Sequence, residues 1–213
     1  MEIFTSLSQG NNIQGLVFLA VALKKSGDSI GSLSIFTKIK RLEPAWITNM
    51  DYYGMLLQEQ GKYSALVRLS GELLDLSKHR AESWLVQAMC CEMKSAHVQA
   101  LSHIDHALQL NNRHLLAHQL KGRLLLEMQK PGEASLSFRN AYRISRDISN
   151  YEGLVRCYIA LGKQLEATST AKEALALLPH SARAVCLAGV VMKENPSLQT
   201  KVIATRFSLN LYV

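Results

Sequence analysis

Cysteine and histidine are the side chains of this sequence whose spacing could support catalysis or metal binding. Cys157 lies between Arg156 and Tyr158 in the stretch NYEGLVRCYIALGKQLEA, with a glycine on either side, as a nucleophile on a tight turn would. A cysteine attacks as its thiolate, which requires some exposure and a neighbouring group that lowers its pKa. The chemistry open to Cys157 therefore depends on whether its backbone forms a turn or a buried helix face.

The histidines form two pairs with helical spacing. His114 and His118 are four residues apart, as are the histidines of a zinc-protease helix, but neither has a glutamate beside it and no third ligand is evident. His103 and His106 are three residues apart, and we expect them to face solvent. The phosphate-binding sequences GxxxxGKS/T and GxGxxG do not occur. We therefore predict neither a metal site nor a cofactor, and the chain is not expected to be an enzyme.

The composition is typical of a globular protein rich in helix-forming residues. The chain has 213 residues, of which 48% are hydrophobic and 19% are charged. Its net charge of +7 comes from lysines and arginines that are scattered singly, which favours a solvated basic surface. The cysteines show no CxxC spacing, and the apolar run from Gly15 to Leu23 is too short to span a membrane. We predict an all-α protein of the nucleus and cytoplasm, where thiols stay reduced.

Alanines recur along the chain at a fixed interval. Two sets have spacings of 34 and 33 residues, and the second set lies seven residues after the first: Ala100, Ala134 and Ala167, then Ala107, Ala141 and Ala174. This is the period of the tetratricopeptide repeat, a pair of helices that buries its apolar residues by stacking on neighbouring pairs. The predicted fold is an all-α, right-handed α-α superhelix (solenoid) of about six such repeats. An irregular segment, 1–12, precedes the array, 13–213, whose repeats are expected at 13–46, 47–80, 81–114, 115–147, 148–181 and 182–213.

Positions are counted here from the first residue of each repeat. Gly27, Gly61 and Gly162 stand at position fifteen, where the first helix should end with a positive φ, whereas repeat four has Gln129 there. Position ten is apolar in all six repeats, so Cys157, at position ten of repeat five, is predicted to be a buried packing residue. The residues predicted to form the structural core and turns are Trp84, Ala88, Ala100, Ala107, Gly122, Ala134, Phe138, Ala141, Tyr151, Leu154, Tyr158, Gly162, Ala167, Ala174 and Pro179.

The first helices of such an array line its concave groove, and positions two, five, nine, twelve and thirteen are expected to point into it. Arg123, Arg156 and Arg183 recur in neighbouring repeats and could bind an acidic or C-terminal peptide. Position nine never holds asparagine, so the clamp of chaperone-binding repeats is missing. The candidate partner-binding residues are Lys24, Lys25, Met55, Met89, Gln119, Arg123, Glu152, Arg156, Arg183 and Lys193.

Four stretches match a particular family at positions that the repeat pattern does not fix. They are NMDYYGMLLQEQGKY from Asn49, HRAESWLVQA from His79, the segment from Ala107 to Ser145 that contains HLLAHQLKGRLLLEMQKPGEASLSFRN, and YEGLVRCYIA from Tyr151. Here the sequence resembles the anaphase-promoting complex subunit 7 family. The resemblance runs through repeats two to five and is weaker in repeat one.

The resemblance implies a non-catalytic scaffold of a multisubunit ubiquitin ligase that directs cell-cycle proteins to degradation. In that family the subunit forms a homodimeric superhelix and stacks on sibling repeat subunits, while cullin and RING subunits elsewhere transfer ubiquitin. Other repeat subunits are the expected partners, together with coactivator or peptide tails. The chain is short for the family and lacks the repeats expected to form the dimer, so a homodimer is not the leading expectation. The tail would place Phe207, Leu209 and Leu211 on a terminal helix that offers a partner surface.

Two other functions are consistent with a helical array. One is a generic tetratricopeptide adaptor that holds a short peptide in its concave groove. The other is an RNA-binding helical-repeat protein, prompted by the basic charge. The 34-residue register and the scatter of basic residues disfavour RNA, because RNA-reading repeats have a different period and a concentrated positive surface. Neither a membrane nor a nucleic acid is expected as a partner.

Overall fold

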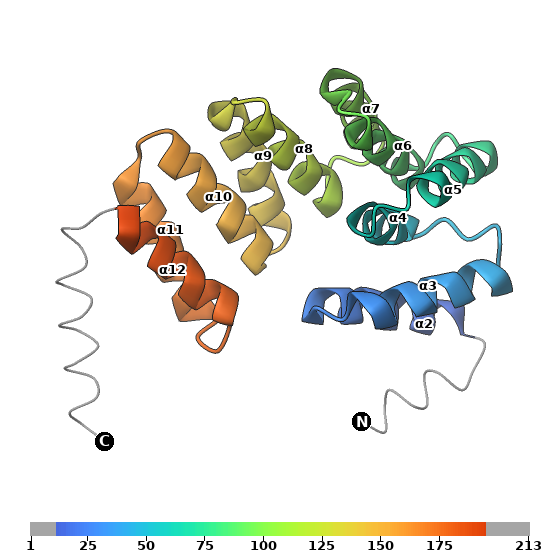
Figure 1. Ribbon diagram of the computed structural model, residues 1–213, viewed down its shortest axis with the longest axis horizontal. Coiled ribbons are helices and arrows are strands. Elements are labelled where there is room, and N and C mark those ends of the chain that lie inside the picture. The colour runs from blue at the N-terminus through green and yellow to red at the C-terminus, as the bar shows by residue number, and fades with distance from the viewer. Residues whose placement is uncertain (1–11, 195–213) are drawn as a thin grey trace. The chain divides into compact units, whose positions relative to one another are not determined.

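The computed structural model describes residues 12–194 (Figure 1). This range contains no strand, which confirms the all-α class. The described helices, in chain order, are α2 (Ile13–Ser26), α3 (Ser29–Leu42), α4 (Met50–Glu59), α5 (Tyr63–Leu76), α6 (Ala81–Met93), α7 (His97–Leu110), α8 (Leu115–Glu127), α9 (Pro131–Ile144), α10 (Ile148–Ala160), α11 (Gln164–Leu177) and α12 (Ala182–Glu194).

The helices alternate as the first and second helices of successive repeats. α2, α6, α8, α10 and α12 begin at the first residues expected for repeats one, three, four, five and six. α4 begins at Met50, three residues after the expected start of repeat two, because Asn49 before it takes a left-handed conformation with φ of 61°. The segment 1–11, the second half of repeat six, and the tail with Phe207, Leu209 and Leu211 lie outside the described residues.

The chain divides into two compact bodies. The N-terminal body ends at Ala117 and the C-terminal body begins at His118, within the first turn of α8. In the N-terminal body α2 packs on α3, α6 packs on α7, and α4 contacts both α5 and α6. In the C-terminal body α10 contacts α9, α11 and α12. α4, α6 and α10 are thus each held by the second helix of their own repeat and by a neighbouring repeat, as a repeat array requires.

A left-handed residue ends the first helix of every repeat whose turn is described. The predicted glycines Gly27, Gly61 and Gly162 have φ values of 98°, 66° and 70°. Ser95 and Gln129 occupy the same position fifteen with φ values of 58° and 59°. Residues that carry a Cβ are strained at positive φ, whereas glycine adopts such φ values freely. The turn therefore belongs to the repeat geometry, and two repeats form it with less suitable residues.

We expect Ser95→Gly and Gln129→Gly each to raise the free energy of unfolding by about 1 kcal/mol. Glycine removes the strain of the positive φ, and this gain exceeds the extra chain entropy that glycine has in the unfolded state. Urea denaturation measures the change. Ser102→Gly, at an exposed position inside α7, is the matched control and should lower the free energy by about 0.5 kcal/mol. Equal effects at all three positions would contradict the assignment.

The aromatic ring of Phe138, in α9, lies between two glycines of the adjoining first helices. A Cβ placed on Gly122 of α8 would come 2.6 Å from the Phe138 ring, and one placed on Gly153 of α10 would come closer still. Real Cβ atoms do not approach a ring so closely. Both glycines are therefore needed to admit a large side chain at this crossing, and Phe138 is 5% exposed as a result.

Position twenty-four of one repeat contacts position six or seven of the next repeat at three described interfaces. Phe36 stacks on Tyr53 with ring centroids 5.8 Å apart, and the Ser70 hydroxyl donates a hydrogen bond to the Gln87 side-chain oxygen at 2.6 Å. The third pair is Phe138 with Gly153. Phe138 meets a glycine at this contact, whereas Phe36 meets the large ring of Tyr53.

Candidate interaction surface

Polar links join successive first helices of the N-terminal body near their C-terminal ends. The Lys24 ammonium of α2 forms an ion pair with the Glu59 carboxylate of α4 at 2.6 Å. The Gln58 amide of α4 donates a hydrogen bond to the Glu92 carboxylate of α6 at 2.7 Å. All four residues occupy position twelve or thirteen. Lys24, a predicted partner-binding residue, is therefore engaged within the chain, although an exposed pair of this kind contributes at most about 1 kcal/mol.

The C-terminal body has two further links of this kind. The Arg183 guanidinium of α12 donates to both oxygens of Glu152 in α10, at 2.5 and 2.9 Å, and this hydrogen bonding raises the pKa of Arg183. The Gln119 amide of α8 donates to Asn150 Oδ1 at 2.7 Å, and the buried Asn150 in turn donates to the backbone oxygen of Ser145 at 2.6 Å. Three more predicted residues, Gln119, Glu152 and Arg183, thus hold neighbouring helices together.

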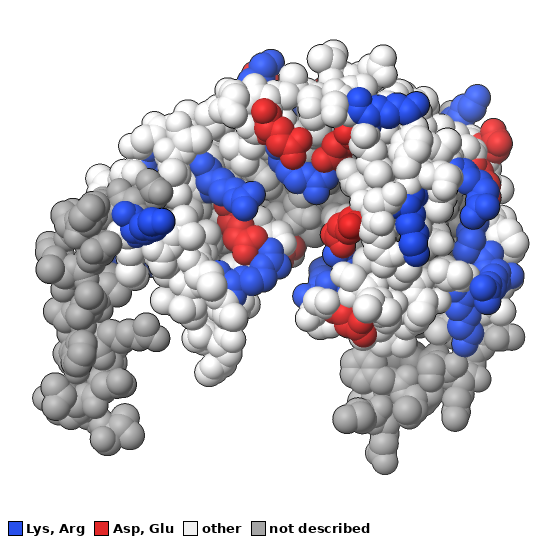
Figure 2. Space-filling model, in the orientation of Figure 1, with Lys and Arg blue, Asp and Glu red and all other residues white. Residues whose placement is uncertain are grey.

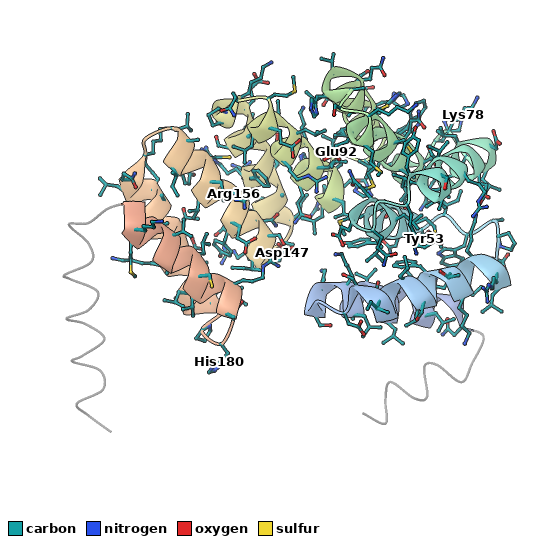
Figure 3. The ribbon with its side chains drawn as sticks, in the orientation of Figure 1. Tyr53, Lys78, Glu92, Asp147, Arg156 and His180 are labelled. Atoms are coloured by element: carbon teal, nitrogen blue, oxygen red, sulfur yellow. The ribbon has the colours of Figure 1, made fainter. Side chains whose placement is uncertain are left out.

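The other predicted residues differ in exposure. Lys25, Arg156 and Lys193 are exposed, and Figure 3 shows Arg156 on α10. Arg123 is exposed on α8, and Met55 is half-buried on α4. Figure 2 shows acidic and basic side chains next to one another on the visible face of each body. The three arginines of the expected set therefore do not form a uniform basic surface, since Arg183 is neutralised by Glu152.

The structure places Met89 differently from the prediction. It was expected to point into the groove, but it is 2% exposed. A Cβ placed on Gly54 would lie 3.3 Å from the sulfur atom of Met89. The missing side chain of Gly54, in the preceding repeat, leaves the space that Met89 fills.

Trp84 also departs from its predicted burial: its ring is half-buried and packs on His106 and His103, with ring centroids 4.4 and 5.6 Å away. These histidines were expected to face solvent, and instead they cover the indole.

Asp51, at position five of repeat two, was expected to point into the groove, but its carboxyl group is buried. Asp51, in the first turn of α4, is 1% exposed, and neither of its oxygens accepts a hydrogen bond. His114 Nε2 lies 3.4 Å from Asp51 Oδ2. Burial raises the pKa of Asp51 to about 6 because the charged carboxylate loses its hydration, the charge of Glu82 adds to the rise, and His114 opposes it. No repeat spacing connects Asp51 with His114, so only the fold reveals the pair.

Cys157 does not have the surroundings of a nucleophile. It is fully buried in α10, and burial raises the pKa of its thiol to about 12. Cys90 and Cys91 are buried as well, whereas Cys186 of α12 is exposed. We expect a thiol reagent such as DTNB to modify Cys186 within minutes and Cys157 only after unfolding. Cys186→Ser should abolish the rapid phase. Rapid labelling that persists in this variant would show that a buried thiol is accessible.

Within residues 12–194 no helix combines the length and the apolarity that a membrane span requires. In the same range, histidine, cysteine and carboxylate side chains form no group of three or more that could hold a metal ion. His114, which the sequence paired with His118, lies instead beside Asp51.

Comparison with curated proteins identifies relatives. The chain is 36% identical to anaphase-promoting complex subunit 7 of Arabidopsis thaliana over 193 residues and 32% identical to that of Homo sapiens over 192, each 90% of the chain. It is 30% identical to the Dictyostelium discoideum subunit 7 over 78% of the chain. These matches cover 34%, 34% and 29% of the relatives, so the chain spans about a third of their length. No protein-family model matches the chain.

Solved structures show the fold. A structure of the anaphase-promoting complex hetero-tetramer Cut9–Hcn1 matches with a TM-score of 0.81 and 20% identity, over 98% of this chain and 41% of the other. A thermophilic tetratricopeptide protein of Thermus thermophilus matches with a TM-score of 0.71 and 17% identity, over 84% of this chain and 98% of the other. Both likenesses agree with the repeat period and the helix pairs: the fold is that of tetratricopeptide repeats.

Proposed function

Because the chain resembles anaphase-promoting complex subunit 7 over 90% of its length and folds as tetratricopeptide repeats, we propose that it is a non-catalytic scaffold component of that ubiquitin ligase. The observation that carries this proposal is the 36% identity to the Arabidopsis subunit, which exceeds what shared repeat architecture produces in the Thermus protein, at 17%. The chain would act through protein-protein contacts with other repeat subunits, and with coactivator or peptide tails. As a component of this complex it would reside in the nucleus and cytoplasm.

The arrangement of polar groups supports a scaffold. The charged residues of α2, α4, α10 and α12 link neighbouring repeats within each body, as in Lys24–Glu59 and Glu152–Arg183. The same pairing weakens the case for a generic peptide adaptor, because fewer charges are available to a peptide terminus. It also weakens the case for RNA, since a paired lysine or arginine contributes less to phosphate binding.

A pull-down from dividing cells tests the proposed function. The tagged chain should recover several subunits of the anaphase-promoting complex, identified by mass spectrometry. The Thermus thermophilus tetratricopeptide protein, tagged identically, is the matched control because it shares the fold but is only 17% identical. The proposal fails if no ligase subunit is enriched over this control. In a reconstituted reaction with ubiquitin-activating and ubiquitin-conjugating enzymes, the chain alone should transfer no ubiquitin.

A further inference from the structure

The outer face of α9 carries positive charges next to an exposed leucine. One side of α9 (Figure 1), which includes Phe138 and Ala141, is buried in the C-terminal body. The opposite side bears Leu136, Arg139 and Arg143, all exposed. Their spacings of three and four residues place the three side chains along one strip of the helix surface. We call these three residues the α9 strip.

Carboxylates do not balance the two arginines along the helix. Ion pairs on a helix form between residues three or four apart, and no residue of α9 at those distances from Arg139 or Arg143 is acidic. The two arginines are themselves four apart, and a third, Arg146, follows three residues later. The single carboxylate of α9, that of Glu133, lies 3.8 Å from Lys130 Nζ in the first turn. The strip thus keeps a repulsion that weakens the helix, which favours a role in binding.

Carboxylates just beyond the strip are engaged with other groups. Glu173 of α11 accepts hydrogen bonds from the hydroxyls of Tyr142 and Tyr151, at 2.6 and 3.2 Å. Asp147, which follows α9, accepts a hydrogen bond from the backbone N–H of Asn150 at 3.2 Å and so caps α10. These two acidic residues therefore serve the joints between helices, and the positive charge of the strip faces outward.

The other second helices show that this charge is not a general property of the repeat. The α9 strip occupies positions twenty-two, twenty-five and twenty-nine. α5 and α7 each have an aspartate at one of these positions, Asp75 and Asp105. α3 is also basic, with Lys38 at position twenty-six and Arg41 at position twenty-nine, but it has Ser34 at position twenty-two. α9 thus combines two arginines with a leucine beside them.

A glycine one turn before Leu136 leaves room for a large side chain of a partner. Gly132 is exposed, and a Cβ placed on it would have no neighbour within 4 Å beyond its own stretch of helix. An apolar side chain of a partner can therefore lie beside Gly132 and pack on Leu136. At the other end of the strip, each guanidinium presents a planar set of N–H donors that matches a carboxylate.

We propose that the α9 strip docks an acidic amphipathic helix of a partner protein, one that presents two carboxylates one turn apart and a large apolar residue one turn further along. A rise of about 1.5 Å per residue separates the two arginines by about 6 Å along α9, as it separates two carboxylates at i and i+4. The residues outside the described range contain a single carboxylate, that of Glu2, so they do not supply such a helix. This inference rests on the proposed scaffold role and specifies one surface of it.

A displayed peptide library tests the proposal with the full chain. The library holds alanine-based peptides of about 18 residues, long enough to form a helix, with random residues at every third and fourth position. Selection on the chain should enrich peptides with acidic residues at i and i+4 and a leucine, phenylalanine or tryptophan at the next turn. Fluorescence anisotropy of an enriched peptide then measures its Kd.

Variants of the strip should weaken this binding in distinct ways. Arg139→Glu combined with Arg143→Glu should weaken it at least about tenfold, because two ion pairs become repulsions. A peptide with lysines in place of its carboxylates should bind this variant more tightly than it binds the natural chain. Leu136→Ala should weaken binding about three- to fivefold without changing its dependence on salt, because the lost contact is apolar. Arg139→Glu alone should raise the urea midpoint of unfolding, which shows that its lost binding is not unfolding.

Lys38→Glu combined with Arg41→Glu is the matched control, because it makes the same change of charge on α3. It should alter binding by less than about twofold, since distant exposed charges are screened. The proposal is overturned if selection enriches no acidic peptide, or if the α3 variant weakens binding as much as the α9 variant. It is also overturned if poly(U) RNA or phosphatidylserine vesicles bind through Arg139 and Arg143 and no peptide does.

The pull-down separates this proposal from the scaffold role. If the α9 variant recovers every ligase subunit that the natural chain recovers, the scaffold role stands and this docking surface is wrong. If the natural chain itself recovers none, the scaffold role fails. Loss of one subunit from the α9 variant, with the α3 variant unaffected, is the expected result.

Discussion

Phe138→Ala is expected to lower the free energy of unfolding by about 4 kcal/mol. The substitution removes a buried aromatic ring, and such losses in protein cores lie at about 3 to 5 kcal/mol. Gly122 and Gly153, on either side of the ring, have no side chains that could move into the space. The cavity should therefore persist in the folded protein, which keeps the effect within that range rather than below it. Urea denaturation followed by circular dichroism measures it.

Leu136→Ala, two residues away in the same helix, is the control. Leu136 is 59% exposed, so its loss should change the stability by less than about 0.5 kcal/mol. Gly153→Ala should itself lower the stability by about 1 to 3 kcal/mol, because the new methyl group overlaps the ring. Combining Gly153→Ala with Phe138→Leu should lose less than the sum of the two single changes. If the two losses in the free energy of unfolding add exactly, the Phe138 ring and a side chain at position 153 do not occupy the same space.

Asp51→Asn is expected to raise the free energy of unfolding by about 2 kcal/mol near pH 7.5. The pKa of Asp51 is about 6 in the folded protein, against an ordinary value of 3.8 for the solvated side chain, so the folded state binds more protons between these values. Stability therefore falls as the pH rises from about 4 to about 6, and the loss of about 3 kcal/mol persists above that range. An amide carries no charge and removes most of this loss, although it also removes the attraction to His114.

The pH profile distinguishes this effect from a change in packing. The difference between Asp51→Asn and the natural chain should shrink as the pH falls from about 8 to about 4.5, where the native carboxyl group is already protonated. Asp75→Asn, at an exposed position on α5, should show no such trend. If Asp51→Asn is less stable than the natural chain at every pH, the carboxylate is stabilised in place and its raised pKa is wrong.

The repeat period predicted features that recur in several repeats. Helix starts at 81, 115, 148 and 182 and the glycine turns at position fifteen follow from columns of similar residues, because each repeat solves the same packing problem. Ser95 shows the limit of this approach. It forms the same left-handed turn without a glycine, since the helices on either side impose the conformation.

Features that arise between unlike positions could not be predicted. Asp51 and His114 stand in different columns of different repeats, and no interval of the sequence connects them. Met89 was placed in the groove because its column faces that way in general, but Gly54 opposite it allows the side chain to turn inward. The pairing of Lys24 with Glu59 likewise depends on the offset between neighbouring helices. Such contacts are visible only in the three-dimensional structure, because each depends on the relative placement of two residues.

The close fit of Phe138 against Gly153 limits how this array could have changed by duplication or exchange of repeats. If repeat four stood before repeat three, the ring of Phe138 would meet Val86, where the present neighbour offers Gly153. Two large side chains would then overlap where the two helices cross. Although the repeats share a backbone, they are not interchangeable parts. A lineage that reorders or copies them must alter both sides of a junction together, so the order of repeats should be inherited with their interfaces.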